Sequence, residues 1–197
     1  RAVASARSLG INPEVVHLSN SAATINDSDS HFDLIRLGIA MYGLSPDIKT
    51  MGGSRELGLI PALTLRARLH LVKDVPAGSK VGYGGTAETK VDTKLGIVAM
   101  GYADGVPRNA TSEVGVLVGN KMSPIIGRVS MDQFVVDLGK ESQLRAGDWA
   151  YLIGSEKGDS YTSDRCYTAD SWAAACGTIN YEIVTRLGPR VKRIYID

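Results

Sequence analysis

An eight-residue stretch, GYADGVPR at residues 101–108, combines a tyrosine, an acidic residue and an arginine around a glycine turn. A free phenol titrates near pH ~10, so a tyrosine works as a base only where positive charge stabilises its phenolate. Any use of Tyr102 as a base would therefore need activation from other parts of the protein. The structural alternative is that Tyr102 ends a buried strand in front of a turn at Asp104 and Gly105.

The overall composition favours a small-molecule partner. The chain has 197 residues with 22 basic and 21 acidic side chains, and its formal net charge is +1. No run of Lys and Arg marks a surface for nucleic acid or for an anionic membrane. Nothing approaches the ~18 consecutive apolar residues of a membrane span, and the chain start lacks the apolar core of a signal peptide, so we expect a cytoplasmic protein.

The two cysteines and the first residue carry further information. Cys166 and Cys176 lie ten positions apart and away from any further Cys or His cluster. This count predicts free thiols and gives no indication of a metal site. The chain begins with Arg1 rather than Met, and its first segment looks like the middle of a larger element, so we expect a fragment of a longer protein.

The first part of the chain alternates between helical and strand-like patterns. The pattern predicts an amphipathic helix over residues 1–10, a short buried strand over 15–19 and a further βα segment over 31–43. Gly and Ser are frequent over residues 44–58, which predicts an extended linker.

From about residue 60 the apolar period becomes two, as a half-buried strand requires, and Leu63 to Leu71 alternate with polar residues. Further strands are expected over residues 94–102, 114–119, 133–139 and 148–154. Gly-Asn and Asp-Gly turns separate several of them, which favours an antiparallel barrel or sandwich.

The last part of the chain changes back to a helical pattern. Residues 168–187 predict helix, with Thr168 or Asp170 as the N-cap and Gly177 as a break. Residues 190–197 predict a closing strand.

Six motifs in a fixed order extend over most of the chain. They are HLSNSAAT (17–24), IRLGIAMYG (35–43), VGYGGT (81–86), GYADGVPR (101–108), GRVSMDQFVVDLG (127–139) and TINYEI (178–183). In this order they closely resemble the C-terminal half of alanine racemase. The resemblance implies an enzyme that interconverts L- and D-alanine, supplies D-alanine for peptidoglycan and works as a head-to-tail homodimer with shared active sites.

The resemblance also implies the architecture. An N-terminal (β/α)8 barrel would carry pyridoxal phosphate on a lysine, and a mainly β, antiparallel barrel-like domain would follow it. We therefore expect the last βα units of the barrel over residues 1–45, a linker over 46–59 and the β domain over 60–197. No lysine here stands in a motif that matches the cofactor lysine, so this chain alone is expected to be inactive and to need the N-terminal barrel portion as its partner.

The resemblance assigns the reaction to two residues. Inverting an α-carbon requires removal of a proton from one face and return to the other, which calls for two bases. Tyr102 would be one base and the cofactor lysine the other. Arg36 would face the pyridine nitrogen of the cofactor, and because an arginine has no proton to give, the nitrogen stays unprotonated and racemisation is favoured over transamination. His17 would orient Arg36. The alternatives are a surface Arg36 paired with Asp33 and a His17 satisfied in the core.

The remaining assignments concern binding. Ser21, the backbone amides of Gly38 and Ile39, and the Tyr181 hydroxyl match the cofactor phosphate site of the family. Leu37 replaces a proline that is frequent there. A Tyr181 packed as an ordinary helix residue is the alternative.

The GRVSMDQ motif supplies the substrate contacts. The N–H of Met131 matches the group that binds the substrate carboxylate, Asp132 would shape the loop, and Arg128 would line the entrance unless it forms a surface salt bridge. The resemblance identifies no entrance residue between Arg108 and Gly127.

Two other classes of protein remain open at this point. An amino-acid decarboxylase of the same architecture would place an acid at the pyridine nitrogen and a catalytic Cys in the partner subunit, and neither feature matches here. A non-enzymatic β module would explain the strands but not the six ordered motifs. A racemase acting on serine or on several amino acids is a variant of the first hypothesis, because one or two pocket residues can set that choice.

Overall fold

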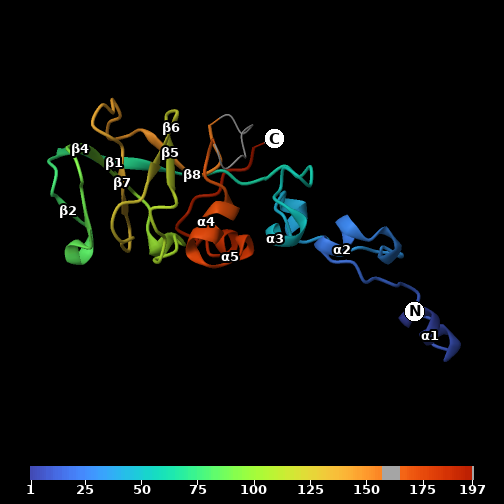
Figure 1. Ribbon diagram of the computed structural model, residues 1–197. Helices are drawn as coiled ribbons and strands as arrows, with labels where there is room; N and C mark the ends of the chain where they lie inside the picture. The colour runs from blue at the N-terminus through green and yellow to red at the C-terminus, as the bar shows by residue number, and fades with distance from the viewer. Residues whose placement is uncertain (157–164, 197) are drawn as a thin grey trace. The chain divides into compact units, whose positions relative to one another are not determined.

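The computed structural model describes residues 1–156 and 165–196 (Figure 1). The chain divides into two compact units, Arg1–Ala62 and Leu63–Asp197. Short helices and extended loops make up the first unit, and strands dominate the second. In the part of the chain that is described, no helix is both long and apolar enough to span a bilayer.

The first unit contains five short helical elements. They are α1 (Ala2–Ser8), α2 (Ser21–Asn26), the 3₁₀ turns η1 (Ser28–Ser30) and η2 (Ile39–Tyr42), and α3 (Ile48–Met51). Between them, two extended segments lie side by side. The N–H of Asp33 donates to the carbonyl of Val16 at 3.1 Å, and that of Arg36 to the carbonyl of Ser19 at 2.8 Å. Both bonds join residues 17 positions apart, so the two segments run in the same direction.

The structure confirms the helix predicted at the start of the chain but not the strand over residues 15–19. Val16 and Ser19 are buried there, whereas Val15 and Leu18 are each more than half exposed. A buried parallel strand needs a hydrogen-bonded neighbour on both sides. Among the described residues, the backbone of this segment is hydrogen-bonded only to that of residues 33–36, so it does not form a strand.

The segment over residues 44–58 is folded, although the sequence predicted an extended linker. It contains α3, whose N-cap Asp47 accepts the N–H of Lys49 at 2.9 Å. The hydroxyl of the fully buried Ser45 donates to the carbonyl of Gly52 at 2.6 Å. Local capping therefore outweighs the flexible composition of this segment. The predicted limits of the linker, 46 and 59, stay a prediction.

The second unit is built on antiparallel strands. They are β1 (Leu65–Val75), β2 (Lys80–Val81), β3 (Ala87–Glu88), β4 (Thr93–Val98), β5 (Gly115–Val118), β6 (Lys121–Pro124), β7 (Phe134–Asp137) and β8 (Trp149–Ile153). Six of them form one sheet in the order β6-β5-β8-β1-β4-β7, and β2 pairs with β3 alone. The two edges of the sheet meet where Ile125 bridges Val136 and where the N–H of Ile126 donates to Val135 at 2.9 Å. The sheet is therefore nearly closed into a barrel, as the sequence predicted.

The core of the second unit follows from alternation along the strands. In β1 the residues Leu65, Ala67 and Leu69 are buried while their neighbours are exposed. Two helices, α4 (Ala169–Cys176) and α5 (Asn180–Thr185), pack together beside the strands (Figure 1). The indole of Trp172 in α4 donates to the carbonyl of Leu152 in β8 at 2.7 Å and meets the ring of Phe134 edge-on. These contacts attach α4 to the barrel.

The predicted strands of this unit are confirmed as β1, β4, β5, β7 and β8, and the short strands β2, β3 and β6 are additions. The helical prediction is confirmed too: Thr168 caps α4, and Gly177 ends it in the left-handed region, at φ +66°. Cys166 and Cys176 are free and buried.

The predicted closing strand over 190–197 is wrong for residues 190–196, and residue 197 lies outside the described residues. Tyr195 and Ile196 are about nine-tenths exposed, and among the described residues no strand pairing or backbone hydrogen bond involves residues 192–196. A strand needs a hydrogen-bonded partner, so the apolar pattern alone does not form one here.

Candidate functional site

The first unit brings Arg36 and His17 together. Nη1 of Arg36 lies 2.6 Å from Nδ1 of His17, and Nη2 of Arg36 donates to the carbonyl of Leu18 at 3.4 Å. Because a guanidinium can only donate, Nδ1 of His17 is the acceptor. Asp33 instead accepts the N–H of Val16 at 2.9 Å, and across residues 1–156 and 165–196 no ion pair joins Asp33 to Arg36. The alternative in which Arg36 forms a surface ion pair with Asp33 is therefore not found in the described part of the chain.

The same unit gathers Ser21 and the amides at residues 38–40. Oγ of the buried Ser21 accepts the N–H of Gly38 at 2.9 Å and approaches the N–H of Ala40 at 3.4 Å. Ile39 begins η2, where the first amides have no acceptor within the helix. A Cβ on Gly38 would meet only this hydroxyl, at 3.7 Å, so the main chain here is open to close approach. A hydroxyl beside clustered amides is a chemistry that can hold a phosphate.

In the second unit, the loop of Tyr102 pairs with the loop of Met131. Tyr102 begins the 3₁₀ turn η4 (Tyr102–Asp104), and its N–H donates to the carbonyl of Ser130 at 3.0 Å. The N–H of Ala103 donates to the carbonyl of Met131 at 2.9 Å. Both the Tyr102 and the Met131 side chains are exposed. Backbone pairing thus brings two predicted site residues together and presents their side chains to solvent.

This close pairing requires a glycine at position 101. A Cβ there would lie 2.3 Å from the carbonyl oxygen of Met131 and 2.4 Å from that of Ser130, and neither backbone atom can rotate away. We expect Gly101→Ala to destabilise the protein by about 2 kcal/mol or more, measured by urea unfolding. The matched control is Gly188→Ala, whose Cβ would make an ordinary 3.7 Å contact, and its effect should stay within about 0.5 kcal/mol. Equal stability of the two variants would contradict the close approach.

Two carboxylates and an arginine surround the same pair of loops. Oδ2 of Asp104 accepts the N–H of Gly101 at 2.9 Å, and its Oδ1 lies 3.1 Å from Nε of Arg190. Nη2 of Arg190 donates to Oδ1 of Asp132 at 2.7 Å. These two carboxylates, Asp132 first, raise the pKa of Arg190 above its ordinary value. The sequence predicted Asp132 as a shaping residue but missed Arg190, which belongs to none of the six motifs.

The GRVSMDQ loop also contacts the 3₁₀ turn η3 (Tyr83–Gly85), which joins β2 to β3. A Cβ on Gly82 would lie 3.1 Å from the backbone N of Arg128, and one on Gly84 would lie 3.9 Å from Nη1 of Arg128. No ion pair within the described ranges involves Arg128. Tyr83, the first residue of this turn, is 73% exposed.

Tyr83 is a further residue that sequence reasoning did not single out. The available signal was a tyrosine inside VGYGGT, where the glycines at 82, 84 and 85 all adopt positive φ. Residues with a side chain rarely adopt a positive φ, so these glycines are needed for the turn that carries the phenol of Tyr83.

Tyr181 lies on α5 and is half-buried. Its carbonyl accepts the hydroxyl of Thr185 at 2.7 Å, an ordinary helix contact. The predicted role of its hydroxyl at a phosphate stays a prediction.

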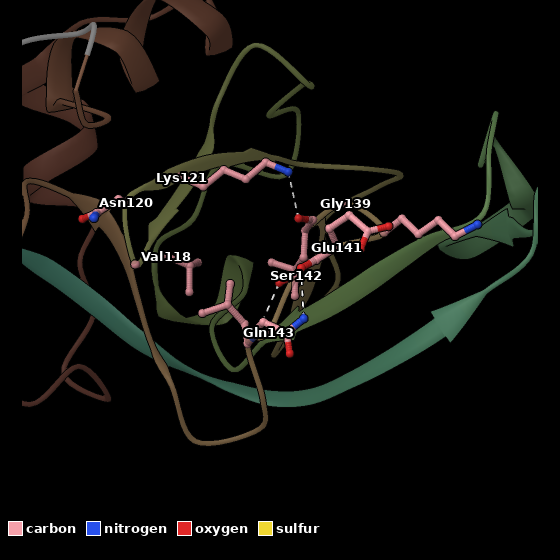
Figure 2. A pocket seen from close by; sticks show the side chains of 11 residues that line it. Val118, Asn120, Lys121, Gly139, Glu141, Ser142 and Gln143 are labelled. Carbon is pink, nitrogen blue, oxygen red and sulfur yellow. Dashed lines mark hydrogen bonds between the residues drawn. The ribbon is translucent and has the colours of Figure 1, made fainter.

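One pocket of the second unit contains none of the predicted site residues. It has a volume of about 550 Å³ and opens between the β5–β6 turn and residues 138–144 (Figure 2). Nζ of Lys121 donates across it to the carbonyl of Leu138 at 2.8 Å.

A nearly closed antiparallel β domain that follows a unit of short helices and extended segments defines the class: proteins with a C-terminal β domain attached to a separate N-terminal unit. The family profile for the alanine racemase C-terminal domain matches residues 62–195, and that for the N-terminal domain matches residues 1–46. The chain belongs to the alanine racemase family.

Individual relatives agree with this assignment. Alanine racemase from Streptomyces coelicolor is 49% identical over 189 residues, covering 95% of this chain and 46% of the relative. The one from Beutenbergia cavernae is 50% identical over 198 residues, covering 99% and 50%. The crystal structure of alanine racemase from Streptomyces lavendulae superposes with a TM-score of 0.88 at 49% identity, covering 99% of this chain and 49% of that one. The chain thus spans about half the length of the relatives it matches.

Proposed function

We propose that this chain supplies the second half of a pyridoxal-phosphate-dependent alanine racemase that interconverts L- and D-alanine. The observation that carries the proposal is that one unit holds both the Arg36–His17 pair and the cup of Ser21 and Gly38. Family membership and the names of the relatives support it. The coarser assignment is an isomerase that acts on an amino acid. The cytoplasmic location, the homodimer and the cell-wall role stay predictions.

The residues of the first unit fit the proposed cofactor. When bound, pyridoxal phosphate supplies the electron sink that makes the α-proton of an amino acid acidic. Oγ of Ser21 and the N–H groups of Gly38 and Ile39 would hold its phosphate, with Tyr181 as a further proposed ligand. Arg36 would face the ring nitrogen, and since a guanidinium cannot donate its proton away, it keeps that nitrogen unprotonated. The lysine that carries the cofactor is proposed to lie outside residues 1–197.

His17 has a specific task in this arrangement. Its Nδ1 accepts from Nη1 of Arg36, so in the neutral ring the proton is on Nε2. A neutral acceptor holds the guanidinium in one orientation without cancelling its charge. A carboxylate in the same place would form an ion pair with Arg36 and weaken its effect on the ring nitrogen.

The second unit would bind the substrate and move a proton. The N–H of Met131 is the proposed donor to the substrate carboxylate, with Asp132 shaping the loop and Arg128 at the entrance. Tyr102 is the base proposed from the sequence. Tyr83 is a competing candidate, because the backbone of η3 lies near Arg128, which has no ion pair within the described ranges, whereas Arg190 near η4 is engaged by two carboxylates. A phenolate is stabilised by a positive charge that is not already neutralised.

The test is a chimera that joins the N-terminal portion of the Streptomyces coelicolor relative to residues 1–197. With pyridoxal phosphate added, we expect conversion of L-alanine to D-alanine. Chiral separation of the products measures this conversion. L-serine in a parallel reaction distinguishes a racemase of broader range. A folded chimera that binds the cofactor, forms neither D-alanine nor D-serine, and converts either amino acid to its amine with release of carbon dioxide would instead support the decarboxylase alternative.

A further inference from the structure

The guanidinium of Arg190 connects two loops that the proposed function places at the substrate. It lies 3.1 Å from Asp104, at the end of η4, and 2.7 Å from Asp132, next to Met131. In the described part of the chain, Arg190 is the one side chain whose ion pairs reach both loops. A residue from the C-terminal segment thus makes an ionic contact with each of them.

The two contacts differ in burial. The side chain of Asp104 is 11% exposed, whereas those of Asp132 and Arg190 are 58% and 54% exposed. Oδ2 of Asp104 accepts the N–H of Gly101, which leaves Oδ1 for the guanidinium. A largely buried carboxylate is costly unless its charge is paired, so the Asp104 contact anchors the arginine. The contact with Asp132 then extends from this anchor to the neighbouring loop.

The backbone places Arg190 at the anchor. The N–H of Gly188 donates to the carbonyl of Asp104 at 3.1 Å, two residues before the arginine. The backbone bonds between residues 102–103 and 130–131 hold the main chains of the loops together. Within the second loop, the N–H of Ser130 donates to the carbonyl of Gln133 at 2.9 Å and closes the turn around Met131 and Asp132. Arg190 adds the ionic contact that joins Asp132 in this turn to the loop of Asp104.

We infer that Arg190 is a positioning residue for substrate binding, which fixes Asp132 and thereby aims the N–H of Met131 at the substrate carboxylate. The inference rests on the proposed function, because that function assigns the carboxylate to Met131. Two separate N–H groups of one planar guanidinium make the two contacts. A lysine ammonium offers a single point charge and cannot reproduce this geometry.

The kinetic test uses the chimera with Arg190→Gln, Asp132→Asn and the double variant. For each single variant we expect KM for L-alanine to rise on the order of tenfold, because displacing a binding group by about 1 Å has effects of this size or larger, while kcat changes by less than about twofold. The double variant should be no worse than Arg190→Gln alone, since Asp132→Asn weakens only a contact that Arg190→Gln has already removed. Arg190→Lys should recover part of the loss by keeping the charge.

The matched control is Arg186→Gln, four positions earlier. Nη1 of Arg186, at the C-cap of α5, pairs with Oε1 of Glu182 at 3.0 Å, and no ion pair within the described ranges joins it to Asp104 or Asp132. This control should keep the KM of the parent. If KM is unchanged in Arg190→Gln, or if the effects at Arg190 and Asp132 add, the inference is overturned. Asp132→Asn alters an exposed side chain and decides the question by itself if Arg190→Gln does not fold.

A second readout does not depend on activity. Amide hydrogen exchange at residues 130–132 should become faster in Arg190→Gln and stay unchanged in Arg186→Gln, because only the first variant releases Asp132. Unchanged exchange in Arg190→Gln overturns the inference even if the parent chimera shows no racemisation. Inactivity of the parent with the expected exchange result counts against the proposed function alone.

Discussion

Tyr83→Phe in the chimera is expected to lower kcat for alanine racemisation by about 10²–10⁴-fold, the range that a general base contributes. The physical reason is that only the hydroxyl is removed while the ring and the turn remain. Tyr83 is a candidate because the backbone of η3 lies near Arg128, whose charge has no carboxylate partner in the described ranges. Single-turnover rates for both enantiomers are the measurement, and the loss should be larger in the direction that starts from the face this tyrosine serves.

Tyr102→Phe is the matched comparison, because it makes the same chemical change on the neighbouring turn. The sequence-based assignment gives the large loss to Tyr102, and the electrostatic argument gives it to Tyr83. A loss confined to Tyr102→Phe would establish the sequence-based assignment and reject ours. Cofactor absorbance should remain normal in both variants, since neither side chain belongs to the proposed phosphate cup, and near-normal turnover in both would remove the tyrosine base from the mechanism altogether.

Arg36→Glu is expected to divert part of the reaction from racemisation to transamination. A carboxylate at this position favours a protonated ring nitrogen, whereas the guanidinium cannot supply a proton. We expect the ratio of keto acid to D-alanine formed from L-alanine to rise on the order of tenfold. His17 would also lose a hydrogen bond, because in the unchanged protein Nη1 of Arg36 donates to Nδ1 of His17 at 2.6 Å.

The control for this prediction is Arg7→Glu, which makes the same charge reversal near the end of α1. The product ratio should then match that of the parent, so a general effect of charge on the fold is excluded. An unchanged ratio in Arg36→Glu, with the cofactor still bound, would show that Arg36 does not face the ring nitrogen.

Much of the second unit could be predicted because its determinants are local. Alternation from Leu63 to Leu71 depends only on the two-residue period of a strand, and it appears as β1. The N-cap at Thr168 and the left-handed Gly177 are likewise set by side chains within a few positions, and both are found. The same local logic fails at residues 190–196, where the apolar pattern finds no strand partner among the described residues and Ile194, Tyr195 and Ile196 are exposed.

The candidate site, too, has features that depend on local sequence and features that depend on the tertiary fold. By itself, the sequence determined the family, the order of the strands along the chain and the motif residues, because these depend on residue types and short spacings. Only the tertiary structure decided that β6 and β7 meet to close the sheet and that Ser21 reaches the amide of Gly38. It also decided that Arg190 lies between two carboxylates, one of them 58 positions away in the chain. Such pairs are set by how the strands and loops fold back on one another, and no local period in the sequence encodes them.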